Sequence, residues 1–237
     1  MVLKSYAKIN LSLSVNEKLK NGYHDIQSIY CLINVYDTIK IKKIYDKKFD
    51  EIYFKGPFSK NVLKFNNSIK KVLDFLRKYK LISNYFKVEV NKKIPVFAGL
   101  GGGSSNAFSI LKLIKQKKIK REILNKLINL VGTDLRLFFN NQGHLRNLKK
   151  VDKLSKNHKL YFMIVYPNIR CLTKKIYSKV KKFSKKRKFS KKNFKSKKEL
   201  INQILNLKND LQSIVEKKYP LIRTLLSNIS KQHNCYL

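Results

Sequence analysis

Residues 6–15 show a regular alternation of apolar and polar side chains. Ile9, Leu11, Leu13 and Val15 take every second position, with polar residues between them. Because successive side chains of a β-strand point to opposite faces, this period of two predicts a strand with one buried face. Residues 85–90 alternate in the same way and predict another strand. A strand-like region is also predicted at residues 23–41, and the continuous apolar run at residues 160–167 predicts a strand ended by proline.

Apolar residues spaced three and four apart predict helices elsewhere in the chain. Val62, Ile69, Val72 and Leu76 follow this spacing, so the first helix is expected to open near residue 60. Further helices are predicted at residues 107–114, 121–130, 173–183, 199–207 and 210–229. Strands and helices alternate along much of the chain, which indicates a mixed α and β protein.

Membrane insertion and disulfide bonding are both disfavoured by the composition. The apolar runs fall well short of the roughly 20 residues that a membrane-spanning helix needs. The N-terminal residues also lack the apolar region of a secretory signal. Cys31, Cys171 and Cys235 are isolated and odd in number, which is typical of neither a disulfide framework nor a zinc site. We therefore expect a cytoplasmic protein without a membrane partner.

The formal net charge of +40 is the strongest compositional signal. A charge of this size is typical of proteins that bind nucleic acid. Nearly all of it comes from lysine, however, and arginine, which recognises bases and phosphates better, is sparse. Lysine is also spread along the whole chain rather than gathered in a patch. We therefore favour a compositional bias, and nucleic-acid binding remains the weaker alternative. The lysine- and serine-rich residues 184–198 are predicted to form an exposed loop.

A glycine-rich stretch lies between the predicted strand at residues 85–90 and a predicted helix. Gly99, Gly101, Gly102 and Gly103 are four of the chain's eight glycines. A strand, a glycine loop and a helix N-terminus together bind phosphate, because backbone N–H groups converge on the anion. The ordinary P-loop ends in Gly-Lys-Ser/Thr, and here Ser104 follows Gly103. We predict a phosphate-binding loop whose helix is capped by residues 104–106, with a plain tight turn as the alternative.

Asp134 follows another glycine, in the sequence Gly132-Thr133-Asp134. Two interpretations remain open from these residues alone. An aspartate after a glycine turn commonly caps a helix, and for an isolated residue this interpretation is favoured. The alternative is a carboxylate with a chemical role.

Several separated segments together resemble the GHMP kinases. Residues 7–11 with residues 21–24 are similar to the first motif of that family, residues 95–107 to its phosphate loop, and residues 132–134 to the motif with its catalytic aspartate. The order and spacing of the segments also agree, and the likeness extends over the whole chain.

The resemblance implies an α+β fold of two domains. Residues 1–150 would form a ribosomal protein S5 domain 2-like, ATP-binding domain. Residues 158–237 would form a ferredoxin-like domain, with residues 151–158 as a linker. A third, glycine-rich motif of the family is not recognisable before Leu237, so the second domain is expected to be truncated.

The Gly22-Tyr23-His24 segment resembles the family members that act on a cytidylylated methylerythritol. The resemblance therefore implies transfer of phosphate from ATP, with Mg²⁺, to the 2-hydroxyl of that substrate in non-mevalonate isoprenoid precursor synthesis. The protein would act as a monomer or homodimer. A catalytically impaired member of the same fold is the alternative that the missing motif suggests.

The resemblance also assigns roles to individual residues. Asp134 would accept the proton of the attacking hydroxyl, and Lys8 would keep Asp134 ionised and stabilise charge on the transferred phosphoryl group. Asn10, Tyr23 and His24 would bind the substrate, the last two through its cytosine ring. The expected ATP-binding residues are Pro95, Gly99, Leu100, Gly101, Gly102, Gly103, Ser104, Ser105 and Asn61. Ser104 and Ser105 are the expected neighbours of Mg²⁺, and Tyr177 is a second candidate for stacking on the cytidine.

Each of these residues also has a plainer interpretation. Lys8 would be a solvated charge on a strand, the usual position of a lysine. Asn10 would pair with a neighbouring strand, and Tyr23 and His24 would flank a surface turn. Two residues depart from the pattern of the family. Phe97 stands where a small residue is usual before the loop, and Arg136 replaces a proline after the aspartate.

Overall fold

The computed structural model describes residues 1–63, 66–112, 119–189 and 194–232. Within it the chain forms two compact units that interleave in sequence. The first unit comprises residues 1–9 and 32–141, and the second comprises residues 10–31 and 142–237. The assignment of residues 1–150 and 158–237 to separate domains stays a prediction.

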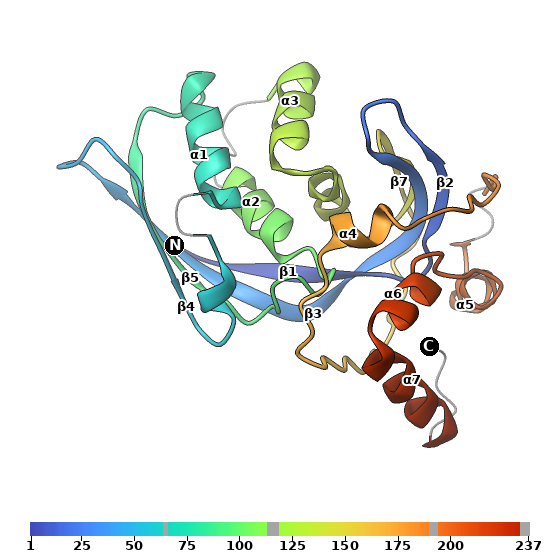
Figure 1. Cartoon of the computed structure of the whole chain (residues 1–237). Helices are drawn as coiled ribbons and strands as arrows, with labels where there is room; N and C mark the ends of the chain where they lie inside the picture. Colours follow the sequence, from blue (N-terminus) through green and yellow to red (C-terminus); the bar gives the residue numbers. More distant parts are fainter. Residues whose placement is uncertain (64–65, 113–118, 190–193, 233–237) are drawn as a thin grey trace. The chain divides into compact units, whose positions relative to one another are not determined.

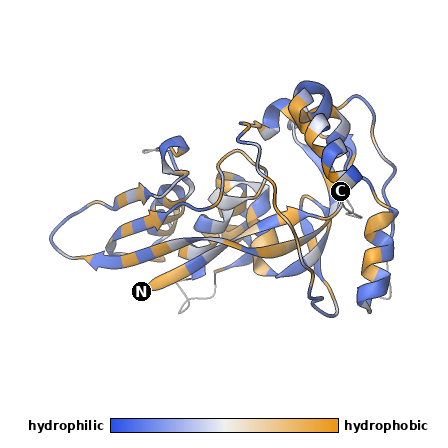
Figure 2. Ribbon diagram, turned by 90° about the horizontal axis from the view of Figure 1, so that it is seen from below, coloured by the Kyte–Doolittle hydropathy of each residue, from blue (hydrophilic) through white to orange (hydrophobic). Residues whose placement is uncertain are grey.

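The first unit contains the C-terminal half of a long strand, β3 (His24–Ile44), and the strands that pair with it. This half pairs antiparallel with β5 (Tyr85–Asn91). β4 (Glu51–Lys55) pairs in parallel with β5 at the edge of the sheet, and β1 (Val2–Asn10) pairs with β3. Hydrophobic and hydrophilic residues alternate along these strands (Figure 2). The strands predicted at residues 23–41 and 85–90 are thus confirmed.

Helices of the first unit cover one face of these strands (Figure 1). Their core joins Ile39 and Val88 of the strands to Leu73, Ile110 and Leu127 of the helices, all of which are fully buried. The helices are α1 (Ser68–Lys78), α2 (Gly102–Lys112), α3 (Arg121–Val131) and the 3-10 helices η1 (Ser59–Asn61) and η2 (Thr133–Phe139). The helix predicted at residues 121–130 is confirmed by α3.

The second unit is built on the N-terminal half of β3, which is buried on both faces. Ile29 packs there with Leu154, Phe194 and Leu200. The strands of this unit are β2 (Ser14–Lys18) and β6 (Gln142–Asn147), both antiparallel to β3, and β7 (Lys150–Lys153), antiparallel to β6. Its helices are α4 (Thr173–Tyr177), α5 (Lys197–Leu205), α6 (Gln212–Lys218) and α7 (Pro220–Gln232).

The prediction of one strand over residues 6–15 is wrong, because β1 and β2 are separate. Between them the backbone N–H of Leu13 donates to Lys208 at 3.2 Å, and its carbonyl accepts from Asp210 at 2.8 Å. These bonds to a distant segment replace a continuous ladder. The predicted burial pattern also fails, since the polar residues Lys8 and Ser12 are buried.

The first helix does not open near residue 60. Asn61 ends the short η1, whereas α1 begins after Asn67, whose Oδ1 accepts the N–H of Lys70 at 2.9 Å. The cap at Asn67 sets this start, because a side-chain oxygen there satisfies a free N–H of the first turn. The helix predicted from residue 107 begins earlier, at Gly102, so residues 104–106 lie within α2 rather than capping it. Residues 113 and 114 lie outside the described residues.

Other helix and linker predictions are corrected in the second unit. The helix predicted at residues 210–229 is two helices, because Pro220 lacks the N–H that a continuous helix requires and instead opens α7. α4 ends at Tyr177 rather than at residue 183. The predicted linker at residues 151–158 contains most of β7 and the buried Leu154. The helix predicted at residues 199–207 is confirmed by α5.

The strand predicted at residues 160–167 is absent from the described structure. The segment has no regular secondary structure, and Tyr161, Met163 and Val165 are exposed. Hydrophobicity alone does not make a strand, because its backbone groups need a partner strand. An apolar run exposed in this way is an aggregation liability.

The lysine-rich residues 184–198 are anchored where the structure describes them; residues 190–193 fall outside that description. Phe194 is buried, and Lys186 forms ion pairs with Glu17 and Asp25. Residues 185–188 are exposed and have no regular secondary structure, so the predicted exposed loop is confirmed there, whereas it is wrong for the buried Phe194 and for residues 197–198, which open α5. The described helices include none that is long and apolar enough to cross a membrane.

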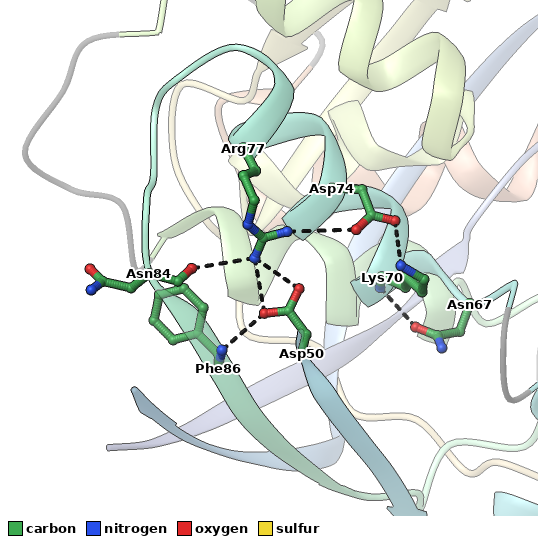
Figure 3. Close-up of polar contacts among 7 residues, drawn as sticks. All are labelled: Asp50, Asn67, Lys70, Asp74, Arg77, Asn84 and Phe86. Atoms are coloured by element: carbon green, nitrogen blue, oxygen red, sulfur yellow. Dashed lines mark hydrogen bonds and ion pairs between the residues drawn. The ribbon is translucent and has the colours of Figure 1, made fainter. Parts of the chain in front are cut away.

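An ion pair in the first unit fixes α1 against the strand edge (Figure 3). Asp50 accepts two hydrogen bonds from Arg77, at 2.9 and 3.0 Å, and one from the backbone N–H of Phe86 at 2.9 Å. Its side chain is only 4% exposed. Asp74 also contacts Arg77, at 3.6 Å, but its side chain is 49% exposed. The two carboxylates thus share a partner and differ in burial.

We expect Asp50→Ala to lower the free energy of unfolding by about 2–3 kcal/mol, because it removes the charged partner of Arg77 and the acceptor of the Phe86 N–H. Asp74→Ala is the matched control, and a solvent-exposed pair should contribute below about 1 kcal/mol. Urea unfolding followed by circular dichroism measures both. Equal losses for the two variants would contradict the role assigned to Asp50.

Candidate functional site

Lys8 and Asp134 form an ion pair within the first unit. The Nζ of Lys8 lies 3.5 Å from Oδ2 of Asp134, and the side chains are 5% and 40% exposed. Lys8 is therefore not a solvated strand charge. The cap position of η2 is Gly132 and makes no side-chain hydrogen bond, so Asp134 does not cap this helix. The ammonium group of Lys8 is thus buried, whereas the carboxylate of Asp134 that it contacts remains accessible to solvent.

The glycine-rich loop lies directly against Lys8. The backbone N–H of Lys8 donates to the carbonyl of Leu100 at 3.0 Å. A Cβ at Gly101 would lie 3.0 Å from both Cγ of Lys8 and Cζ of Phe138, and the φ of Gly101 is +69°. Glycine is needed here for space and for backbone conformation. Phe97 also has a positive φ, +64°, which explains why a residue without a large side chain is the easier choice there.

The N-terminus of α2 faces the same turn. The first turn of a helix leaves N–H groups without helical acceptors, and these groups with the helix dipole attract anions. Here the first helical bond runs from the N–H of Ser105 to Gly101, at 2.9 Å. The Oγ of Ser104 lies 4.0 Å from the position of a Cβ at Gly132, next to Asp134. Ser105 is buried, and its Oγ accepts a hydrogen bond from Ser5 at 2.8 Å.

The start of the loop and η1 are close together. The N–H of Phe58 donates to the carbonyl of Lys92 at 3.3 Å. Asn61 is exposed at the end of η1. Pro95 lies in the loop two residues before Phe97. The structure therefore places η1 beside the start of the loop that contains Pro95, although Asn61 does not open a long helix.

A buried polar network behind the loop was not predicted from the sequence. Asp37 forms an ion pair with Lys92 and accepts a hydrogen bond from Asn106 at 2.9 Å. Burial lowers the pKa of Lys92, and the negative charge of Asp37 opposes this change. In the sequence, Asp37 and Lys92 are each a single charged residue within or just after an apolar strand. Hydrophobic periodicity does not indicate what such a residue contacts.

The remaining predicted residues belong to the second unit. Asn10 accepts a hydrogen bond from Ser28 of β3 at 3.1 Å, so it does pair with a neighbouring strand. Tyr23 follows the Asn21–Gly22 turn and is exposed. The ring of His24 lies 5.4 Å from that of Tyr177. Burial, with the charge of Lys18 as a smaller cause, lowers the pKa of His24.

Arg136 connects η2 to α3. Its Nη2 donates to Oδ1 of Asn125 at 3.0 Å. Burial lowers the pKa of this guanidinium, and the charge of Arg121 adds to the effect. The departure from the expected proline thus gives η2 a polar anchor on the neighbouring helix.

Comparisons with known proteins agree with this geometry. Residues 67–138 match the family described as GHMP kinases N terminal domain. The 4-diphosphocytidyl-2-C-methyl-D-erythritol kinase of Pelagibacter ubique (strain HTCC1062) is 37% identical over 96% of this chain and 81% of its own length. The kinase of the same name from Ureaplasma parvum serovar 3 is 33% identical over 94% of this chain and 86% of its own length. The chain belongs to the GHMP kinase family.

Solved structures confirm the predicted fold of this GHMP kinase. A crystal structure of 4-(cytidine 5'-diphospho)-2C-methyl-D-erythritol kinase matches with a TM-score of 0.64 at 20% identity, covering 95% of this chain and 81% of the other. A homoserine kinase from Cytophaga hutchinsonii matches with a TM-score of 0.52 at 16% identity, covering 77% and 60%. The α+β GHMP kinase fold inferred from the sequence is therefore confirmed.

Two glycines of this GHMP kinase provide a matched test of the loop. We expect Gly101→Ala to lower the free energy of unfolding by about 2 kcal/mol or more, because a Cβ there is both strained and crowded. Gly103 lies in the first turn of α2, and a Cβ there would meet only Ser68 Oγ, at 3.7 Å. Gly103→Ala should therefore stabilise by about 0.5 kcal/mol, the usual gain in a helix. Thermal and urea unfolding measure both, and a neutral Gly101→Ala would contradict the close packing.

Proposed function

We propose that this protein is an ATP-dependent kinase that phosphorylates the 2-hydroxyl of 4-diphosphocytidyl-2-C-methyl-D-erythritol, a step in isoprenoid precursor synthesis. The observation that carries the proposal is the Lys8–Asp134 pair, held at 3.5 Å beside a glycine-rich loop. The names of the relatives supply the substrate. This pair and loop are what phosphoryl transfer needs, because that reaction depends on positioning and charge neutralisation.

The exposure of the two side chains suggests their separate roles. Asp134, at 40% exposed, is open to a substrate hydroxyl, whereas Lys8 is held behind it at 5%. Asp134 would take the proton of the hydroxyl as its oxygen attacks the γ-phosphorus of ATP. The bond from that phosphorus to the β–γ bridging oxygen then breaks, and ADP leaves. Lys8 would hold the carboxylate in position and stabilise the charge on the transferred group.

The loop and the helix that follows would hold the triphosphate. Gly99 and Gly101 have positive φ values, and such turns direct consecutive backbone N–H groups to one side. Gly102 and Gly103 open α2 and leave their N–H groups without helical acceptors. Pro95, Leu100 and Asn61 would complete the nucleotide site. The adenine contact of Asn61 rests on its place beside the start of the loop.

We propose Mg²⁺ as the metal of this reaction, where it would neutralise phosphate charge. Within the described residues no three His, Cys, Asp or Glu side chains gather in a group that would hold a metal ion. The accessible carboxylate of Asp134 and the hydroxyl of Ser104 are oxygen donors of the kind that Mg²⁺ prefers. Mg²⁺ is commonly bound by one or two carboxylates, waters and substrate phosphates rather than by a protein cage. Ser104, beside the turn of Asp134, suits a metal-bound phosphate better than Ser105, whose hydroxyl bonds to Ser5.

For the cytidine of the substrate we propose Tyr23, His24 and Tyr177 of the second unit, with Asn10 as a further polar contact. The rings of His24 and Tyr177 are already close, and Tyr23 is exposed. Aromatic rings of this kind offer stacking surfaces to a pyrimidine. The lowered pKa of His24 favours a neutral ring that both donates and accepts hydrogen bonds.

We also propose a reducing location, the cytoplasm. In the described part of the chain, Cys31 and Cys171 are free thiols. Burial raises the pKa of Cys31 to about 12, so this thiol stays protonated and unreactive.

We expect Asp134→Asn and Lys8→Met to lower kcat by about 10²–10⁴-fold, the usual contribution of a general base and its partner. Asp74→Asn is the matched control, because Asp74 is also a half-exposed carboxylate paired with a lysine, at 2.7 Å from Lys70. A coupled assay of ADP release with the cytidylylated substrate, ATP and Mg²⁺ measures all three. Wild-type turnover retained by Asp134→Asn would contradict the mechanism.

A separate kinetic test addresses the substrate residues. Tyr23→Ala and His24→Ala should each raise the KM for the cytidylylated substrate about tenfold, since stacking on one base contributes about 1–3 kcal/mol. The KM for ATP should not change. Tyr45→Ala is the control, because Tyr45 is an exposed tyrosine of the first unit. Equal effects on the two KM values would exclude a specific contact with the cytidine.

A further inference from the structure

Behind the glycine-rich loop lies a closed group of polar side chains that the mechanism above does not use. All five are at most 3% exposed, and all belong to the first unit. They are Ser5 of β1, Asp37 of β3, Lys92 after β5, and Ser105 and Asn106 of α2. Polar groups are costly to bury, so their arrangement calls for a physical reason.

Asp37 connects the two ends of the loop. Its Oδ1 accepts the backbone N–H groups of Lys93 at 2.7 Å and of Ile94 at 2.9 Å, where the chain enters the loop. Its Oδ2 pairs with Lys92 and accepts from Nδ2 of Asn106 at 2.9 Å, after the chain has left the loop for α2. One carboxylate therefore fixes both the entry and the exit of the loop.

The same network reaches the strand of Lys8. Nδ2 of Asn106 also donates to Oγ of Ser5 at 2.9 Å, and Ser5 donates to Ser105 at 2.8 Å. Ser5 lies three residues before Lys8 on β1. The loop and the catalytic lysine are thus tied to one another from behind, in addition to the bond between Lys8 and Leu100.

Lys92 lies close to the first residue of α2. A Cβ at Gly102 would be 3.3 Å from Nζ of Lys92 and 3.0 Å from Cγ2 of Ile94. The ammonium group therefore packs against the start of the helix. Stability alone is a poor explanation for this pair, because apolar residues of similar volume often replace a buried ion pair without loss.

We infer that Asp37 is a positioning residue for nucleotide binding, which together with Lys92 and Asn106 holds the phosphate-binding loop in a fixed position relative to Lys8. This inference rests on the proposed function of the loop. Asp37 touches neither nucleotide nor substrate and acts through the backbone of Lys93 and Ile94.

Two double variants separate positioning from stability. Asp37→Asn/Lys92→Met keeps an oxygen that accepts the loop N–H groups and removes the buried charges. Asp37→Leu/Lys92→Met removes the same charges and leaves those N–H groups without an acceptor. Calorimetric titration with ADP measures the affinity of each. We expect the Leu variant to bind ADP at least about tenfold more weakly than the Asn variant, since small displacements of binding groups are costly.

Asp50→Asn is the control for general destabilisation. Asp50 also accepts a backbone N–H, from Phe86, and pairs with a basic side chain, Arg77. The Asp50→Asn variant should lower the melting temperature of the protein without changing its affinity for ADP. Equal ADP affinities for the two double variants would overturn the inference, as would an equal loss of affinity in Asp50→Asn.

If the Leu variant does not fold, Ser5→Ala decides. It leaves the buried Asp37–Lys92 pair intact and cuts the link from Asn106 to β1, so ADP affinity should fall about threefold, as for one lost neutral hydrogen bond. An unchanged affinity would overturn the inference.

The proposed function and the role of Asp37 can fail separately. A wild-type protein that binds ADP but does not turn over the cytidylylated substrate contradicts the proposed function. The ADP titrations would still decide the role of Asp37. A wild-type protein that does not bind ADP contradicts both.

Discussion

The site depends on holding the buried ammonium group of Lys8 beside the carboxylate of Asp134. A buried cation is stable only beside a fixed negative partner, and Asp134 provides it from η2. The stem of Lys8 in turn limits what the loop can be, because only glycine fits at residue 101 between Lys8 and Phe138. Strand, loop and 3-10 helix are therefore constrained by one side chain, although they are far apart in sequence.

Long regular elements were predictable because their periodicity repeats many times. β3, β5, α3 and α5 agree with the pattern of apolar residues. The predictions failed where a partner or a single residue decides the outcome. Residues 160–167 are apolar enough for a strand but lack a described partner strand, and Pro220 divides a helix whose pattern is continuous. The alternation around Lys8 predicted an exposed polar face, whereas burial there depends on contacts with the loop and η2.

The chemistry of the site was predictable in part for a related reason. The glycine cluster is a local pattern and led to Gly101 directly, whereas the roles predicted for Lys8 and Asp134 came from the resemblance to the GHMP kinases. Asp37 and Lys92 are separated by 55 positions, and neither has a distinctive neighbourhood in the sequence. Such pairs become visible only when the fold brings β3 and the end of β5 together. Whether Tyr23, His24 and Asn61 contact ligands stays a prediction.

The interleaving of the two units has a consequence for how this chain can be divided. The chain passes between them at residues 9–10, 31–32 and 141–142. A single cut after residue 141 leaves residues 10–31 of the second unit attached to the first, so terminal deletions alone cannot isolate the unit that contains the glycine-rich loop. A minimal version would instead require residues 1–9 to be rejoined to residues 32–141 by a designed linker.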